Sequence, residues 1–164
     1  MDPAGAVKAM LISAIMMFAA AAHGSARPLD ACHVLTKAEI ASVQGAAYTD
    51  TTLTTHENTT TCFYQLPLFT NSVSLDVTRT GAREFWEQHF EHESPGEEQE
   101  EQSSPPLKVT GVGDEAFWIG GRAAGSLYVR KGDSMLRVSV GGKGNDREKI
   151  VRSKRLAIKA LRRI

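Results

Sequence analysis

Residues 109–140, VTGVGDEAFWIGGRAAGSLYVRKGDSMLRVSV, contain the pattern that decides the fold of this chain. Apolar and polar residues alternate in two runs, 126–130 and 136–140, with the period of half-buried antiparallel strands. Lys131-Gly132-Asp133 separates the two runs, and a glycine at such a reversal permits the positive φ that tight turns need. The sequence therefore predicts a β-hairpin with one face in a core.

Residues 1–26 are predicted to be a secretory signal peptide. Lys8 gives a weakly positive start, residues 10–22 are apolar apart from Ser13, and small residues follow at 24–26. The apolar run is shorter than the roughly 20 residues of a membrane-spanning helix, which favours export over a retained anchor. Residues 29–32, LDAC, superficially resemble the box at which bacterial lipoproteins are acylated, but the apolar run ends well before them.

The rest of the chain, 27–164, is long enough for one domain and too short for two. Its formal net charge is zero, a balance that does not point to nucleic acid. Two cysteines in an exported chain, Cys32 and Cys62, are most simply a disulfide. Two free thiols in a reducing compartment are the alternative if the chain is not exported.

The first half of this domain carries one helix signal and three strand signals. Thr36 and Glu39 have the spacing of a capping box, and Gly45 is placed to end the helix that follows. The threonine-rich runs 49–55 and 59–63 favour strands, and residues 73–78 alternate in the same way as the hairpin.

A second helix is predicted from Gly81 to about Glu93. Five residues share its apolar side: Ala82, Phe85, Trp86, His89 and Phe90. Residues 94–106, SPGEEQEEQSSPP, offer nothing large and apolar to bury, so we predict a mobile acidic, proline-rich loop there.

A third helix is predicted from about Asn145 to the end of the chain. Its apolar face would hold Ile150, Ala157, Ile158, Leu161 and Ile164, and Lys154 falls within that face. Its opposite face would hold Arg152, Arg155, Lys159 and Arg162. These cations are either a solvated helical face or a surface that engages an anionic envelope polymer or a charged partner.

The candidates for chemistry are few. His89, His92 and Glu93 project from one side of a helix, as metal ligands do, but no further histidine has a fixed spacing to them. No Gly-x-Ser-x-Gly elbow is present, and the glycines at 111, 113, 120 and 121 are not followed by the lysine and helix of a phosphate loop. We therefore expect no enzyme activity, no metal and no cofactor.

Phe117 and Trp118 are adjacent and would face opposite sides of a strand. Two interpretations remain open. Helices cover both aromatic residues on the two sides of the sheet, or one of them, with Trp118 the candidate, is exposed as a contact for a ligand or partner.

Several motifs together resemble a group of uncharacterised bacterial envelope proteins. These motifs are Cys-x-Val-Leu-Thr-x-Ala-Glu-Ile from Cys32, Cys-x-Tyr from Cys62, Gly-Val-Gly-Asp-Glu-Ala-Phe from Gly111, and Leu-Tyr-Val-Arg-Lys-Gly-Asp from Leu127. Many members are lipoproteins with a domain of unknown function, and some related domains have the fold of the photosystem-associated PsbP proteins. Acylated relatives carry a separate cysteine directly after the apolar run, which this chain lacks. The resemblance implies an α+β sandwich with a cysteine bridge from the first helix to the sheet.

The sequence thus predicts a single α+β domain: an antiparallel sheet of about six or seven strands flanked by an amino-terminal helix and two amphipathic helices, in a PsbP-like sandwich. We expect an exported protein of the periplasm, cell envelope or exterior, without a transmembrane segment, that binds a partner protein or small ligand without catalysis. One alternative is a small metal-dependent or hydrolytic enzyme that uses His89, His92 and Glu93. Another is an assembly subunit that engages an anionic surface through its basic carboxy-terminal helix.

Overall fold

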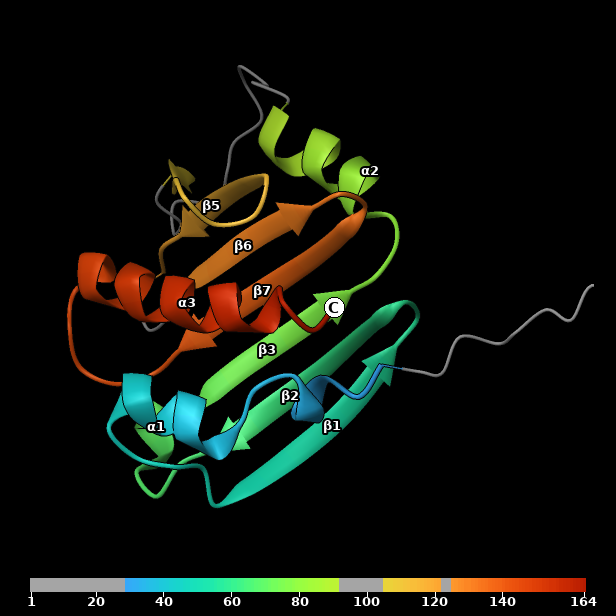
Figure 1. Cartoon of the computed structure of the whole chain (residues 1–164). Coiled ribbons are helices and arrows are strands. Elements are labelled where there is room, and N and C mark those ends of the chain that lie inside the picture. Colours follow the sequence, from blue (N-terminus) through green and yellow to red (C-terminus); the bar gives the residue numbers. More distant parts are fainter. Residues whose placement is uncertain (1–28, 92–104, 122–124) are drawn as a thin grey trace, which may run out of the picture.

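The computed structural model describes residues 29–91, 105–121 and 125–164. These residues form one antiparallel sheet of seven strands with helices packed against it, so the predicted α+β class is confirmed (Figure 1). The strands are β1 (Asp50–His56), β2 (Thr59–Gln65), β3 (Val73–Thr78), β4 (Leu107–Lys108), β5 (Glu115–Ile119), β6 (Ser126–Lys131) and β7 (Ser134–Val140). The predicted signal peptide, 1–26, lies outside the described residues.

The strand order is β1-β2-β3-β7-β6-β5-β4, so the sheet consists of two runs of neighbouring strands that meet at its centre. There β3 pairs with β7 in a register that runs from Val73 opposite Val140 to Thr78 opposite Met135. Among the described residues, β1 and β4 are the edge strands. The predicted hairpin is β6–β7, with Gly132 in its turn at φ +61°.

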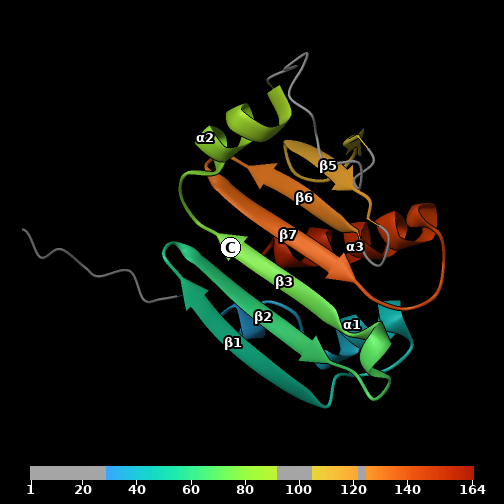
Figure 2. The ribbon, with the colours of Figure 1, turned by 180° about the vertical axis from the view of Figure 1, so that it is seen from behind.

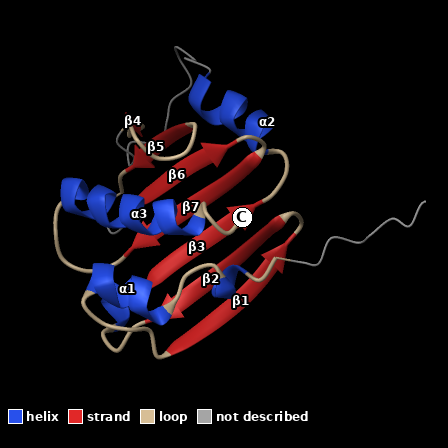
Figure 3. Ribbon diagram, in the orientation of Figure 1, coloured by secondary structure: helices blue, strands red, loops and turns tan. Residues whose placement is uncertain are grey.

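Helices α1 (Lys37–Gln44) and α3 (Asp146–Ala160) lie on one face of the sheet, together with the 3-10 turn η1 (Ala31–His33) (Figure 3). From behind, the strands β1, β2, β3 and β7 lie in front of these helices (Figure 2). α1 begins with the predicted capping box of Thr36 and Glu39 and ends at Gly45, whose φ is +81°. α3 has a capping box too, between Asn145 and Glu148.

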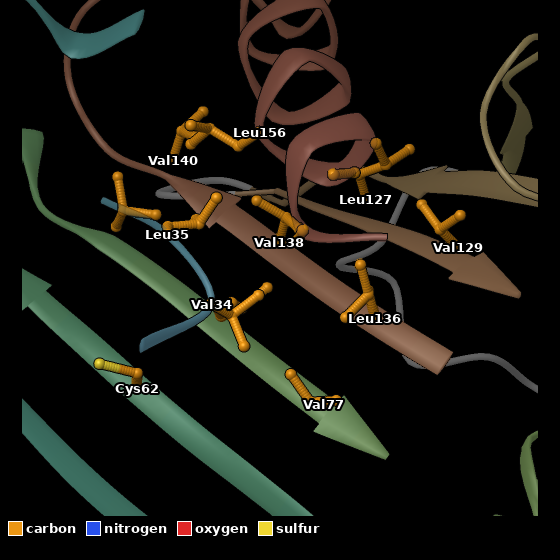
Figure 4. Packing of buried hydrophobic residues seen from close by; sticks show 14 of the residues in the cluster. Val34, Leu35, Cys62, Val77, Leu127, Val129, Leu136, Val138, Val140 and Leu156 are labelled. Carbon is orange, nitrogen blue, oxygen red and sulfur yellow. The ribbon is translucent and has the colours of Figure 1, made fainter. Parts of the chain in front are cut away.

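The main core lies between the sheet and these helices. The alternate residues of β3, β6 and β7 that point to this side are 0 to 1 % exposed: Val73, Leu75, Val77, Leu127, Val129, Leu136, Val138 and Val140. Val34 and Leu35, from the segment after η1, lie over the strands, and Leu156 of α3 lies near Val140 (Figure 4). The alternation read from the sequence therefore places these side chains in one layer.

A second, aromatic cluster lies on the other side of the sheet. It joins α2 (Ala82–Trp86) and the π-helical turn η3 (Glu87–Glu91) to β5, β6 and β7. Trp86 is 1 % exposed, and its ring centroid lies 4.6 Å from that of Phe90 and 5.7 Å from that of Phe117. The predicted second helix is thus confirmed through Trp86 and then widens to a π-turn.

Asp133, in the β6–β7 turn, caps α2 from a distance. Its carboxylate accepts the backbone N–H groups of Gly81 at 3.0 Å and Arg83 at 3.2 Å. These two hydrogen bonds hold the pKa of Asp133 below its usual range. The hairpin turn and the start of α2 are therefore held together, although they lie about 50 residues apart in the chain.

Candidate functional site

The predicted disulfide is present. The Sγ atoms of Cys32 and Cys62 are bonded, with their Cα atoms 5.0 Å apart, so η1 is tied to β2. Beside it, the Tyr64 hydroxyl is buried and donates a 2.7 Å hydrogen bond to the Ala31 carbonyl. Burial raises the pKa of this phenol. The bridge lies within the hydrophobic core and is structural.

Trp118 does not form an exposed contact. It is 2 % exposed and belongs to the main core, while Phe117 is half-buried under α2 on the other side of the sheet. Both aromatic residues are therefore covered, each on its own side of the sheet. The interpretation of Trp118 as a contact for a ligand or partner is wrong, because the side that it faces is filled by the core.

The candidate metal cluster of His89, His92 and Glu93 is only partly described. His89 is exposed, stacks on Phe85 with ring centroids 4.0 Å apart, and places Nδ1 2.8 Å from the Phe85 carbonyl oxygen. His92 and Glu93 lie outside the described residues, as do 94–104 of the predicted loop. Within the described ranges, no three His, Cys, Asp or Glu side chains are grouped so as to hold a metal ion.

The buried face of α3 differs from the predicted one. Leu156, Ala157, Ala160 and Leu161 are buried and so is Ser153, whereas Ile158 is 36 % exposed. Ala157 and Leu161 are buried as predicted, but the actual face also includes the small residues Ser153 and Ala160 in place of Ile158. Ile158, predicted to be inside, therefore lies on the outer surface.

Arg152 is also not where the sequence placed it. The side chain is half-buried, and its guanidinium donates hydrogen bonds to the carbonyls of Gly141 and Lys143 and to Gln44 Oε1, at 2.9 to 3.2 Å. The bond to Gln44 joins the middle of α3 to the end of α1, and the other two join α3 to the segment between β7 and α3. Arg152 is thus a structural residue, and the basic surface of α3 is built from other side chains.

The outer surface of α3 and of the turn that follows it carries a row of five exposed residues, which we call the α3 stripe: Arg147, Val151, Arg155, Ile158 and, in the turn, Arg162. Successive members are three or four positions apart, so they follow one another along a single side of the helix. Arginine and aliphatic residues alternate in the row, and Val151 is 53 % exposed. The stripe therefore presents three guanidinium groups with apolar surface between them.

The arginines of the α3 stripe are not neutralised within the described part of the chain. No carboxylate there lies within 4.0 Å of Arg147, Arg155 or Arg162; Arg155 makes one long contact, 3.4 Å, with the Ser42 carbonyl. Arg163, which follows, is paired with Glu39 instead. The predicted candidates Arg155 and Arg162 are thus exposed, whereas Lys159 is half-buried.

A hollow of about 610 Å³ lies beside the amino-terminal end of the α3 stripe. Its walls are Lys143, Gly144, Arg147, Glu148, Val151 and Arg152. Glu148 accepts the Asn145 N–H at 3.0 Å in the capping box, and Arg152 is held by its carbonyl partners. None of the three cations in this wall is in an ion pair within the described residues, and the side chains of Lys143 and Arg147 make no hydrogen bond there either.

Comparison with known proteins returns no relative. No family model, curated protein or solved structure matches the chain. The resemblance to bacterial envelope domains, and the PsbP-like fold that it implies, therefore stay predictions.

Part of this site can be predicted from the sequence alone. The many cations near the carboxy terminus indicate a basic helix there, and Arg155 and Arg162 are exposed, as predicted. Arg147, Val151 and Ile158 were missed, although their spacing of three and four residues could have indicated a mixed basic and aliphatic row.

No helix in the described ranges is long and apolar enough to cross a membrane.

Proposed function

We propose that this chain is an exported, non-catalytic binding protein whose α3 stripe engages an acidic partner protein. Export is supported by the signal-like residues 1–26 and by the disulfide, since such bonds persist in oxidising compartments. The observation that carries the binding proposal is the exposed row of arginines on α3 with Val151 and Ile158 between them.

The chemistry of the row favours a protein over a uniformly anionic polymer. Arginine forms bidentate hydrogen bonds with carboxylates, which makes it well suited to Asp and Glu side chains. The two exposed aliphatic residues would cover those ion pairs and need apolar side chains opposite them. A polysaccharide offers carboxylates without such side chains, and two aliphatic residues are too few for a helix that inserts into lipid.

The second candidate function is a metal-dependent or hydrolytic enzyme that uses His89, His92 and Glu93. The exposed imidazole of His89 is accessible to a ligand, which favours this idea over a core histidine. Its Nδ1 already faces the Phe85 carbonyl, so Nε2 would have to be the ligand atom. A zinc titration of the protein followed by calorimetry tests this alternative directly.

The binding proposal is tested with a defined probe: a helical peptide in which Glu and Leu alternate at the spacing of the α3 stripe. We expect it to bind the protein more tightly than a peptide of scrambled sequence, and to lose affinity as salt rises from about 50 mM to about 300 mM. The variant Arg147→Glu/Arg155→Glu/Arg162→Glu should bind at least about tenfold more weakly.

A matched variant controls for net charge. Arg79→Glu/Arg83→Glu/Lys108→Glu reverses three exposed cations outside α3, of which Arg83 lies on α2 and Lys108 on β4 opposite Phe117, so it should bind the peptide almost as the unmodified protein does. Equal losses in both variants, or equal affinity for the scrambled peptide, would refute the proposed stripe. Tighter binding to vesicles with anionic headgroups than to either peptide would replace the protein partner by a membrane surface.

A further inference from the structure

The edge strand β1 is open to pairing. Its sequence, Asp50 to His56, is DTTLTTH, and among the described residues only the strand β2 pairs with it. Edge strands are commonly protected by lysine, proline, a bulge or shortness. β1 is seven residues long and contains neither lysine nor proline, and six of the seven residues are exposed. Such an edge can accept a further strand.

The direction of the backbone groups defines which residues can form that pairing. The β1–β2 hairpin is closed by the two residues Glu57 and Asn58, with His56 opposite Thr59. In a hairpin of this kind the pair that flanks the turn is hydrogen-bonded, and inward and outward residues alternate from there. Thr51, Leu53 and Thr55 therefore direct their N–H and C=O groups away from the sheet.

The sequence of β1 is nearly symmetric about Leu53. If a second copy of β1 lies antiparallel with Leu53 opposite Leu53, each threonine faces a threonine: Thr51 faces Thr55, and Thr52 faces Thr54. Thr51, Leu53 and Thr55, whose backbone groups point away from the sheet, then lie opposite the same three residues of the second copy. This arrangement allows a continuous ladder of backbone hydrogen bonds. Leu53, 45 % exposed in the single chain, would be covered by its own counterpart at the two-fold axis.

The ends of the strand add charge complementarity to this symmetry. In the same register Asp50 faces His56 of the second copy, and the symmetry axis repeats that contact at the other end. Both side chains are exposed, and within the described residues neither makes a hydrogen bond or an ion pair. A carboxylate accepts a hydrogen bond from an imidazole N–H, so the two contacts fix both the direction and the register of the pairing.

We infer that β1 is a self-association surface: two copies pair antiparallel through β1 about an axis at Leu53, so that their sheets become one. A two-fold contact of this kind uses the same surface on both copies and closes, so it yields a dimer rather than a fibre. The shared strand pair is a small interface, so the dimer should be weak and depend on concentration. The α3 stripe is not part of this contact.

Analytical ultracentrifugation of the disulfide-bonded protein over a wide concentration range tests the inference. We expect a reversible monomer–dimer equilibrium. Leu53→Lys places two ammonium groups together at the axis and should abolish the dimer. Leu107→Lys is the matched control, because Leu107 is also an exposed leucine, 57 % against 45 % for Leu53, on the opposite edge strand, β4; this variant should leave the equilibrium unchanged.

A charge swap tests the register itself. Asp50→Arg places arginine opposite histidine and His56→Glu places glutamate opposite aspartate, so each single variant should weaken the dimer. The double variant makes the strand ends complementary again and should restore it. A monomer at every concentration, a dimer lost in Leu107→Lys but not in Leu53→Lys, or no recovery in the double variant would each overturn the inference.

Discussion

The guanidinium of Arg163 donates two hydrogen bonds of 2.9 Å to the carboxylate of Glu39, so the residues that follow α3 are joined to the first turn of α1. Arg163 also donates to the Val34 carbonyl at 2.8 Å. Glu39 in turn accepts the Thr36 N–H in the capping box at 2.9 Å. The hydrogen bonds from Arg163 are the main reason that the pKa of Glu39 falls to about 2.

The Glu39–Arg163 pair predicts how stability depends on pH. A carboxyl whose pKa is lower in the folded state stabilises the fold above its unfolded pKa, here 4.5, and the stabilisation is lost as pH falls towards 2. Glu39→Gln keeps an acceptor for the capping box but cannot ionise. We expect its free energy of unfolding in urea to fall less than that of the unmodified protein between about pH 5 and about pH 2.5. Asp133 contributes in the same direction in both proteins, so identical pH profiles would contradict the assignment to Glu39.

Removal of the disulfide should lower stability substantially. The bridge joins residues 30 positions apart, and in the chain-entropy model a loop of that length contributes about 3 to 4 kcal/mol. We expect Cys32→Ala/Cys62→Ala to lower the urea midpoint accordingly, and reduction of the unmodified protein to have a similar effect. The bridge in the starting material is verified if its intact mass is about 2 Da below that of the reduced protein. Unchanged stability in both cases would mean that the core holds η1 on β2 without the bond.

Two glycines should tolerate alanine very differently. At Gly141 a Cβ atom would clash with the Thr70 carbonyl oxygen, which belongs to the backbone and cannot move aside. At Gly45 a Cβ atom meets nothing within 4 Å, and only the positive φ of +81° opposes it. We expect Gly141→Ala to cost about 3 kcal/mol or more and Gly45→Ala about 1 kcal/mol, measured by thermal and urea unfolding. The reverse order would show that strain at the end of α1 matters more than close packing beside η2 (Phe69–Asn71).

Trp86 should be the main anchor of α2 on the sheet. Trp86→Ala empties the space beside the stacked rings of Phe90 and Phe117 and should cost about 3 to 5 kcal/mol. Trp86→Phe keeps most of that volume and removes Nε1, a buried atom without a hydrogen-bond partner in the described structure, so it should cost about 1 to 2 kcal/mol. Unfolding can be followed in both variants by the fluorescence of Trp118, and similar costs would argue against Trp86 as the anchor.

Local sequence patterns predicted many of the helices and strands, but they could not predict contacts between residues far apart in the chain. The β6–β7 hairpin and the capping box of α1 depend on neighbouring residues, so alternation and spacing were sufficient to predict them. The pairing of β3 with β7 joins segments about 60 residues apart, and nothing in either strand identifies its partner. The cap that Asp133 provides for α2 was missed for the same reason.

Only part of the candidate site was predicted, because the charge of a helix can be read from its sequence whereas the side that packs on the sheet depends on tertiary contacts. The cations of α3 were evident, but hydrophobicity alone misjudged which side of the helix packs. Ser153 and Ala160 are buried because they are small, and Arg152 is half-buried because three acceptors surround its guanidinium. Neither cause produces a periodic pattern of apolar residues in the sequence, so Ile158 was assigned to the wrong side of α3.

The pairing of β3 with β7 also has a consequence for the time that the chain needs to fold. Each neighbouring pair of strands within β1–β2–β3 and β6–β7 can form quickly from local contacts, whereas the centre of the sheet forms only when a loop of about 60 residues closes. Cys32 and Cys62 both precede β3, so their bond does not shorten that loop. We therefore expect the oxidised and reduced chains to close the same long loop before β3 can pair with β7.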